Sequence, residues 1–596
     1  MGTSARTLST AIIPRALAAA VAAGLLTLSG LAWAQSGIWT GTASGNWSDT
    51  NNWTDGVVAD GSGNTADFNS IDITTDLAVH LDSARTNGYL IFGDVAVNTS
   101  AGWVLDNNNN VANVLTLAGE TPTITVNNIG TNTLITAPKS IVVSNVVAGF
   151  SGLTKAGSGR LKLTGANTYT GGTVISGGRL SIVAENGLGA VPGSFQTNNI
   201  TLTNGATLEL TALLDVDNQG SSVTLNANRG IVLCAGVQIL QRNHRGQNFI
   251  INGIISGPGS LCFNGDLGGD GDQGGGSGFD INGANTYSGD TYLGWASGQY
   301  KGYAYRINNT LALQNSTLNY INYFGFSESL NRENLVTLPA NCVLGGLAGG
   351  VNAGQTKSLT VPGKMSVGNN NKDTTYSGYL IGGGSLIKIG TGKLTLGTNN
   401  TYSGGTTIAG GTLKISADGN LGAPGSGLVI TNAGTLDLGS GCVGPTRSVA
   451  VINGTNFIAG AGSITVTNIL FSNTTATICC AFTNNGAMKI VDSAINFSNN
   501  CWLGEGSSVT WCLNAVQSLI TVTNGTLYLP TRLTFNASNA VPLNSRTEVL
   551  LLNAANNGIA GSPAQWTVVP EPYQVVHKGN SLVLTIIPDG TIVIVR

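Results

Sequence analysis

Short runs of apolar residues, many of them alternating with polar ones, recur along most of the chain. Examples are Leu77-Ala78-Val79, Ile124-Thr125-Val126 and Ile141-Val142-Val143, and Asn, Gly, Thr or Pro residues separate such runs. Alternation of this kind predicts short β-strands with one buried and one solvent-facing side. No stretch beyond the N-terminal leader shows helical periodicity, so we predict an all-β protein. Strands at this spacing fit either a β-helix or a β-sandwich.

A thirty-residue pattern that occurs twice decides between these two folds. Residues 153–182 (LTKAGSGRLKLTGANTYTGGTVISGGRLSI) and 386–415 (LIKIGTGKLTLGTNNTYSGGTTIAGGTLKI) are identical at 17 of 30 positions. Each copy predicts three short strands, separated by glycine pairs such as Gly177-Gly178 that permit positive φ angles. Such a unit cannot bury its own apolar side and must stack on similar units. We therefore predict a single-stranded, right-handed parallel β-helix, a β-solenoid, with a cap at each end.

The two copies share the pattern K-x-G-x-G-x-L-x-L-x-x-x-N-T-Y-x-G-G-T-x-I-x-x-G-x-L-x-I, from Lys155 to Ile182 and from Lys388 to Ile415. This pattern resembles the autotransporter-associated β-strand repeat, which is also called the passenger-associated transport repeat. A degenerate third copy at residues 281–294 keeps the central Asn-Thr-Tyr. The resemblance implies an exported β-helical passenger whose repeat is associated with secretion and folding, and it implies no chemical reaction.

Composition indicates one elongated body and excludes several classes of protein. Charged residues make up 9% of the 596 residues, and there are 85 glycines. An ordinary domain has about 25% charged residues and about half this share of glycine. The formal net charge is −3 and 41% of the residues are hydrophobic, which together exclude intrinsic disorder. Because the chain has no excess of basic residues, we expect no nucleic-acid partner.

The N-terminal residues predict a secretory leader. Arg6 and Arg15 come before or at the start of the apolar run 16–28, and Ala32-Trp33-Ala34 has the form of a cleavage site. The alternative is a membrane anchor, but the run is shorter than the roughly 20 apolar residues that a spanning helix needs. We therefore predict a signal peptide over residues 1–34, and no membrane-spanning segment once it is removed.

Three further segments follow the leader. We expect a Trp-rich N-terminal cap at 35–70, a β-helix at 71–480 that contains the repeats, and a C-terminal β cap at 481–596. The last segment has no room for a dozen membrane strands of about ten residues, so we expect no translocator barrel within this sequence. The secretion route and the mode of anchoring stay open.

Residues 35–70 contain Trp39, Trp47 and Trp53. Aromatic side chains on a β surface can bind sugars by stacking, which would make this segment a carbohydrate platform. Alternatively, these side chains cover the open end of the first coil, because solenoids need capping units. We favour the second interpretation.

The most polar insertion is the glycine-rich loop Asp266–Asp280. Its carboxylates could bind Ca²⁺, which accepts oxygen ligands in flexible geometry. A solvated loop is the simpler interpretation, and whether the loop binds calcium stays open. The same region supplies the residues for a sugar-cleaving site, which needs clustered carboxylates and often a basic group. The candidates for that site are Asp266, Asp270, Asp272, Asp280, Arg242, His244 and Arg245.

Three tyrosines recur with a preceding Asn-Thr and could be mistaken for functional residues. Their spacing places them several coils apart, so they cannot form one pocket. We expect each tyrosine to lock its own coil while the asparagine bonds to the backbone at a corner. The residues are Tyr169, Tyr287 and Tyr402, with Asn167, Asn285 and Asn400.

Eight cysteines are too few for a disulfide scaffold in a chain of this length, and none has metal-binding spacing. The segment between Cys501 and Cys512 is nearly symmetric about Gly504-Glu505-Gly506, so a hairpin could bring the two sulfurs together. A purely structural role for both cysteines is the alternative, and the pairing stays open.

These observations predict a secreted or cell-surface, adhesin-like β-helix passenger that is not an enzyme. We assign no catalytic, cofactor-binding or metal-binding residues, and we expect no cofactor. Expected partners are cell-surface polysaccharide or outer-membrane components, and the oligomeric state is open. The alternative function is a carbohydrate-active β-helix, either a polysaccharide lyase or hydrolase or a glycan-binding protein.

Overall fold

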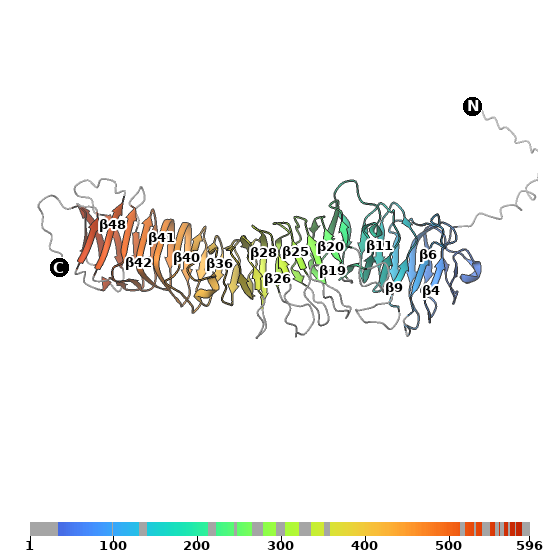
Figure 1. The fold of residues 1–596 in the computed structure, drawn as a ribbon, viewed down its shortest axis with the longest axis horizontal. Helices are drawn as coiled ribbons and strands as arrows, with labels where there is room; N and C mark the ends of the chain where they lie inside the picture. Colours follow the sequence, from blue (N-terminus) through green and yellow to red (C-terminus); the bar gives the residue numbers. More distant parts are fainter. Residues whose placement is uncertain are drawn as a thin grey trace, which may run out of the picture.

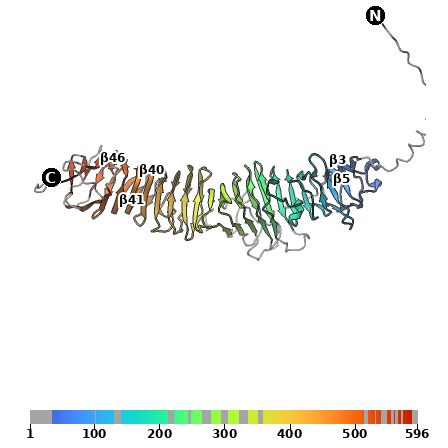
Figure 2. The same cartoon turned by 90° about the horizontal axis from the view of Figure 1, so that it is seen from above.

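In a computed structural model the chain forms a long rod of stacked coils, with the first strands at one end and the last strands at the other (Figure 1). The view turned by 90° shows the same narrow rod (Figure 2). The structure describes residues 34–97, 99, 101–129, 140–211, 222–242, 247–264, 278–293, 304–320, 335–350, 358–512, 519–529, 532–538, 549–554, 559–560, 565–569, 573–578 and 580–586.

The N-terminal half of the rod is built from three parallel sheets that run along its axis. The first contains β1 (Gly37–Ile38), β3 (Gly61–Phe68), β5 (Arg85–Phe92), β7 (Leu115–Leu117), β8 (Thr123–Val126), β10 (Val147–Ala148), β11 (Leu153–Ala156), β13 (Thr173–Ile175), β15 (Gln196–Leu202), β18 (Arg229–Leu233) and β21 (Ile255–Ser256). The second contains β2 (Gly45–Asn46), β4 (Leu77–His80), β6 (Trp103–Asp106), β9 (Ser140–Val143), β12 (Arg160–Leu163), β14 (Arg179–Ile182), β16 (Thr207–Leu210), β19 (Val237–Arg242), β22 (Ser260–Asn264), β24 (Thr291–Leu293), β26 (Leu313–Tyr320) and β28 (Val343–Gly350). The third contains β17 (Val223–Leu225), β20 (Asn248–Ile251), β23 (Gly278–Ile281), β25 (Ala304–Ile307) and β27 (Leu335–Thr337), and β29 (Ser358–Thr360) pairs with β32 (Tyr379–Ile381).

The C-terminal half has three faces, which we call A, B and C. Face A contains β39 (Cys442–Val443), β44 (Cys501–Leu503), β47 (Leu527–Tyr528) and β50 (Ile559–Ala560). Face B contains β30 (Lys364–Val367), β33 (Ser385–Lys388), β35 (Thr406–Ile408), β37 (Leu428–Thr431), β45 (Ser508–Cys512), β48 (Arg532–Ser538) and β51 (Gln565–Val569). Face C contains β31 (Thr374–Ser377), β34 (Lys393–Leu396), β36 (Thr412–Lys414), β38 (Thr435–Asp437), β43 (Ala494–Phe497), β46 (Leu519–Val522) and β49 (Val549–Ala554).

Three long strands bend around the corners of the rod and contribute to more than one face. They are β40 (Ser448–Ala459), β41 (Ser463–Ile478) and β42 (Ala481–Val491). For example, β41 pairs in turn with β39, with the start of β40 and with the end of β40. The predicted parallel β-helix is confirmed, because strand after strand pairs in parallel with its counterpart in the next coil.

Each repeat contributes four strands rather than the three that the sequence predicted. In the first copy these are β11, β12, β13 and β14, and in the second β33, β34, β35 and β36. Leu153 aligns with Thr173 and Leu386 aligns with Thr406, so one coil takes 20 residues and one repeat spans one and a half coils. The additional strand arises because the repeat re-enters the face on which it began.

The core is a set of apolar ladders that run along the inside of the rod. Leu161, Leu180, Leu208 and Leu240 form one such ladder on consecutive coils, and each is completely buried. Because successive residues of a strand point to opposite sides, the intervening side chains face outward.

The helical content of the described residues is limited to four single turns of 3₁₀-helix. These are η1 (Thr50–Asn52), η2 (Thr54–Gly56), η3 (Glu185–Leu188) and η4 (Asp418–Leu421). Within the same residues no helix has the length and apolar character required to cross a bilayer.

Parallel stacking continues beyond residue 480, where we predicted the C-terminal cap to begin. The pairs β45–β48 and β48–β51 keep the parallel register of face B. Antiparallel pairing of whole strands begins with β52 (Tyr573–Lys578) and β53 (Ser581–Ile586), since β53 pairs with both β49 and β52 in that sense.

Candidate binding surface

The Asn-Thr-Tyr motif holds neighbouring coils together. Asn400 accepts a hydrogen bond from the backbone N–H of Leu380 in the preceding coil (2.8 Å) and donates one to the carbonyl of Asn420 in the following coil (2.7 Å). Asn167 and Asn285 make the equivalent pairs of bonds. The predicted corner bonds of these asparagines are confirmed, with the difference that each one joins adjacent coils.

The tyrosine of each motif is buried inside the rod. The hydroxyls of Tyr169, Tyr287 and Tyr402 lie 2.8, 2.6 and 2.6 Å from the hydroxyl of the threonine four residues later. Burial raises the pKa of each of the three phenols to about 12. The predicted structural role of these tyrosines is confirmed, since none of them reaches the surface.

A buried lysine occupies the same position in both repeats. Lys155 and Lys388 stand in inward ladders that are otherwise apolar, and their exposed fractions are 0% and 1%. Each ammonium donates to three backbone carbonyls at 2.6–3.2 Å, and desolvation lowers the lysine pKa to about 7 and about 8 respectively. The carbonyls belong to Ala156, Gly157 and Gly177 in one copy and to Ile389, Gly390 and Gly410 in the other.

A buried arginine follows each repeat and was not found from the sequence. Arg447 donates to the carboxylate of Asp418 and to the carbonyls of Leu421 and Gly422 at the end of η4. Arg229 does the same for η3 in the coil after the first repeat. A guanidinium suits this position because its fixed array of five donors can satisfy several carbonyls at once. The chemistry of the repeats is therefore directed into the rod, and contacts with other molecules fall to the outward residues.

The tryptophans of residues 35–70 do not form a surface platform. Trp39, Trp47 and Trp53 have exposed fractions of 0%, 0% and 3%, and they pack around Phe68 with ring centroids 5.3–5.7 Å apart. Their indole N–H groups donate to the backbone carbonyls of Gly41, Ala59 and Trp47. Because the rings are covered, the carbohydrate platform considered for this segment is wrong.

The candidate residues for a sugar-cleaving or calcium site are only partly described. Asp266, Asp270, Asp272, His244 and Arg245 lie outside the described residues. Asp280 lies on β23 in an ion pair with Arg306 from the next coil. Arg242 lies at the end of β19 on a different sheet and is completely buried. The structure therefore places Asp280 and Arg242 on different sheets.

Glu209 is the centre of a buried ionic cluster on outward positions of β12, β14 and β16. Its carboxylate accepts hydrogen bonds from Arg160 and Arg179, each at 2.7 Å, and from the hydroxyl of Ser181. Burial alone would raise the pKa of Glu209, but the two guanidinium groups and Ser181 hold this pKa below its ordinary value. The cluster binds three neighbouring coils to one another.

The hairpin that would have paired Cys501 with Cys512 does not form. Cys501 lies on β44 of face A, whereas Cys512 ends β45 of face B, and both strands pair in parallel with β42. Cys501 is a free thiol, so the disulfide is absent. Burial raises the pKa of this thiol far above its ordinary value.

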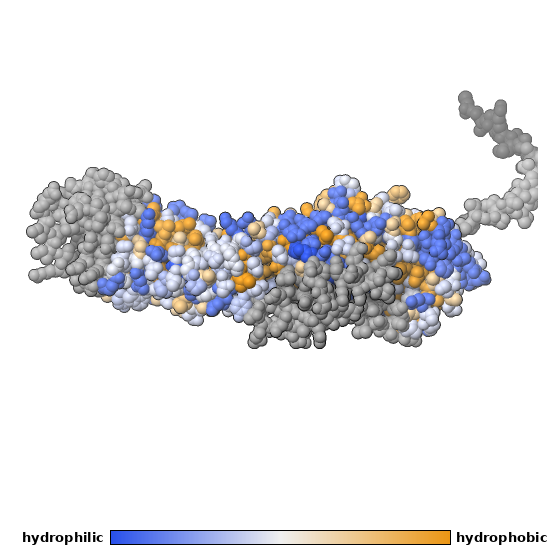
Figure 3. All heavy atoms as spheres, viewed as in Figure 1, coloured by the Kyte–Doolittle hydropathy of each residue, from blue (hydrophilic) through white to orange (hydrophobic). Residues whose placement is uncertain are grey.

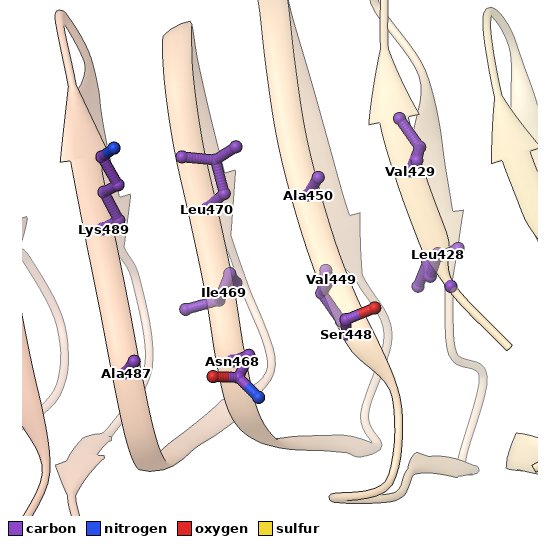
Figure 4. A pocket seen from close by; sticks show the side chains of 11 residues that line it. Leu428, Val429, Ser448, Val449, Ala450, Asn468, Ile469, Leu470, Ala487 and Lys489 are labelled. Carbon is purple, nitrogen blue, oxygen red and sulfur yellow. The ribbon is translucent and has the colours of Figure 1, made fainter. Parts of the chain in front are cut away.

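The outer surface carries apolar patches separated by polar areas, and one patch lies over the strands around β41 (Figure 3). In this region of face B a shallow trough of about 360 Å³ crosses β37, β40, β41 and β42. Val429, Ala450, Leu470 and Lys489 stand in register on consecutive coils and form its floor (Figure 4). Its other lining residues are Gly427, Leu428, Ser448, Val449, Asn468, Ile469 and Ala487. The trough could hold an extended apolar segment, and it contains no cluster of acidic or nucleophilic groups.

Comparison with known proteins gives a partial match. The family model of the passenger-associated-transport-repeat matches residues 153–182 and 386–415. The chain carries two passenger-associated transport repeats. A stretch of 159 residues, 27% of the chain, is 38% identical to an adhesin, the BmaC autotransporter of Brucella suis biovar 1 (strain 1330). The match spans only 4% of the length of that relative. No solved structure matches the chain.

Although the repeat model does not match the degenerate third copy, the structure shows the same contacts there. Asn285 and Tyr287 make the bonds that Asn400 and Tyr402 make in the second passenger-associated transport repeat. The Asn and Tyr bonds of the repeat therefore occur in more coils than the family pattern identifies.

Proposed function

We propose that this chain is a cell-surface, adhesin-like passenger without catalytic activity, whose rod holds binding faces away from the cell. The observation that carries the proposal is that the residues shared by the two repeats are buried or form corners. Lys155, Asn167 and Tyr169, for example, are all at most 4% exposed. Because the shared residues of the repeat stabilise the rod from inside and at its corners, the outward side chains can differ from coil to coil. That arrangement suits a protein that presents a surface to a partner.

The relative supports the same conclusion, since its name describes an autotransporter adhesin. Because the match spans a small part of that protein, we transfer only the general role of surface contact. We also propose that export depends on a leader within residues 1–34, and that the outward faces engage polysaccharide or other components of an outer cell surface.

The proposal is tested on cells that produce the protein. An antibody against residues 358–512 should label intact cells, and external protease should remove that label. A deletion strain should attach more weakly to its surfaces, and the purified chain coated on beads should confer attachment. Labelling that requires broken cells, or attachment that is unchanged by the deletion, would contradict the proposal.

The absence of catalysis is tested separately. The purified chain should release no new ends from a panel of polysaccharides. Turnover that is abolished by Asp270→Asn or Asp272→Asn would overturn this part of the proposal and establish the enzyme instead.

A further inference from the structure

Two aromatic side chains stack on the outer surface of face A, far along the rod from the buried tryptophan cluster. Trp502 on β44 and Tyr528 on β47 are register partners in adjacent coils. Their ring centroids are 5.0 Å apart and their planes differ by 6°. Both side chains are partly exposed, whereas their neighbours Cys501 and Leu527 point into the core. The two rings are therefore stacked on the outside of the rod.

The polar tips of this pair are unused. Within the described part of the chain, neither the indole N–H of Trp502 nor the hydroxyl of Tyr528 has a hydrogen-bond partner. By contrast, the indoles of Trp39, Trp47 and Trp53 all donate to backbone carbonyls. Partly exposed tyrosine and tryptophan with free tips are typical of binding surfaces, where one part of the ring is apolar and another is wet.

The face of the Trp502 indole that Tyr528 does not cover is directed toward a row of threonine side chains. Thr465, Thr483, Trp502 and Tyr528 are consecutive register partners along the rod axis, so Thr483 adjoins the face of Trp502 that Tyr528 does not cover. Both threonine side chains are partly exposed, and their hydroxyls have no partner among the described residues. The outward positions of β41, β42, β44 and β47 on this face are uncharged; they are Ser463, Thr465, Ala481, Thr483, Trp502 and Tyr528.

We infer that Trp502 and the threonine row form a carbohydrate-binding site for an extended pyranose polysaccharide. The inference rests on the proposed function, because it specifies the class of molecule that the adhesin-like rod binds. The apolar C–H face of a pyranose ring stacks on the indole of Trp502, and Tyr528 supports the indole from behind. Sugar hydroxyls bond to Thr483 and Thr465.

The chemistry of the row favours a glycan over a protein. A protein–protein interface typically has a larger apolar core, which a polar rim surrounds. The row instead offers one aromatic face followed by uncharged hydroxyls, which matches a neutral ligand that has alternating apolar faces and hydroxyl groups.

The test uses the purified full-length chain and four defined polymers. Retention is measured on insoluble cellulose and chitin, and by affinity electrophoresis in xylan and mannan. Wild type should be retained by at least one polymer. Trp502→Ala should weaken retention by about tenfold, and Trp502→Phe should keep part of it because a smaller aromatic face remains. Tyr528→Ala should weaken retention less than Trp502→Ala does.

Two variants separate the site from effects on folding. Thr483→Arg leaves the aromatic pair intact, but its long side chain lies over the indole face, so it should abolish retention. Phe457→Ala removes a 39% exposed aromatic side chain from face C and should leave retention unchanged. Circular dichroism and thermal unfolding show which variants keep the wild-type fold.

Several results would overturn the inference. They are no retention of wild type by any of the four polymers, equal retention of wild type and folded Trp502→Ala, and equal losses for Trp502→Ala and Phe457→Ala. Attachment of coated beads that persists in a Trp502→Ala chain with unchanged glycan retention would sink the inference while the proposed adhesin function survives. Glycan retention by a protein that is never found on the cell surface would refute the proposed function alone.

Discussion

Nε of Arg447 donates a hydrogen bond of 2.7 Å to Oδ1 of Asp418, from the coil that follows η4. The same guanidinium bonds to the carbonyls that η4 leaves unpaired at its end, including those of Leu421 and Gly422. The last carbonyls of a helical turn have no partner within the turn. Arg447 therefore supplies, from another coil, the bonds that this corner cannot make for itself.

We predict that Arg447→Met destabilises the rod around η4 by about 1–3 kcal/mol, because it leaves several carbonyls and the partly exposed carboxylate of Asp418 without a donor. Arg447→Lys should recover little of this loss, since an ammonium cannot reach all of those acceptors. Hydrogen exchange of the backbone amides of β37 and β40 measures the local effect. Lys393→Met, which removes a surface charge that pairs loosely with Asp373, should change exchange very little. Equal protection in the Arg447 and Lys393 variants would contradict the prediction.

A glycine at the corner of the first repeat is predicted to be required for the full stability of the rod. Gly178 has a φ of +59°, and a Cβ there would lie 2.5 Å from the carbonyl oxygen of Gly159 and 2.6 Å from that of Gly157. Gly178→Ala should therefore lower the free energy of unfolding by at least about 1–2 kcal/mol. Gly193 has open space around the same position and no positive φ, so Gly193→Ala is the matched control. Chemical denaturation of both variants tests the difference, and a neutral Gly178→Ala would show that the corner can relax.

The stacking of the rod could be predicted from the sequence because its signal is repeated. Alternating residues and glycine pairs occur in both copies of the repeat, and the corner role of Asn400 and the structural role of Tyr402 followed from their recurrence. The number of strands per repeat was wrong, because the run Leu153–Ala156 was not counted as a strand. Strand boundaries depend on where a coil turns, which the periodicity of a single strand does not specify.

Contacts between residues that belong to no shared local pattern were missed in the sequence analysis. Arg229 and Arg447 lie at different distances after their repeats, so comparison of the two copies could not align them. Trp502 and Tyr528 are 26 residues apart and become neighbours only through the register of β44 and β47. The symmetric Cys501–Cys512 segment predicted a hairpin, but a corner of the rod divides it between two faces. In a solenoid, a contact between residues of different coils can be predicted only when the length of every intervening loop is known.

Lys388 is predicted to make the stability of the second repeat depend on pH in the alkaline range. Its pKa is about 8 in the folded chain, against 10.5 for an ordinary lysine, because burial disfavours the charged form. Between these values the unfolded chain binds more protons, so the free energy of unfolding rises with pH by at most about 1.4 kcal/mol per pH unit. Below about pH 8 the penalty for burying the charge is fully present. Lys388→Met should make the pH dependence between pH 8 and 10.5 less positive than that of wild type while the contribution of Lys155 remains, whereas Lys364→Met, at an exposed position of β30, should keep the wild-type profile. Denaturation midpoints from pH 7 to 10.5 test this, and identical profiles for the two variants would contradict it.

Glu209 is predicted to control stability in acid. Its pKa in the folded chain lies below the ordinary 4.5, since Arg160, Arg179 and Ser181 outweigh the effect of burial. A carboxylate with a lowered pKa contributes stability above its unfolded pKa and loses it as the pH falls through the folded value. Glu209→Gln keeps the shape of the side chain but leaves two guanidinium groups without their counter-charge, so we expect a loss of about 3 kcal/mol or more at neutral pH. The same variant should lose less further stability between pH 5 and 2 than wild type does.

Glu185→Gln is the matched control for this prediction. The partly exposed carboxylate of Glu185 pairs with Arg229 at 3.2 Å, and its substitution should lower the free energy of unfolding much less. Parallel acid profiles for wild type and Glu209→Gln would show that Glu209 is already neutral in the folded rod.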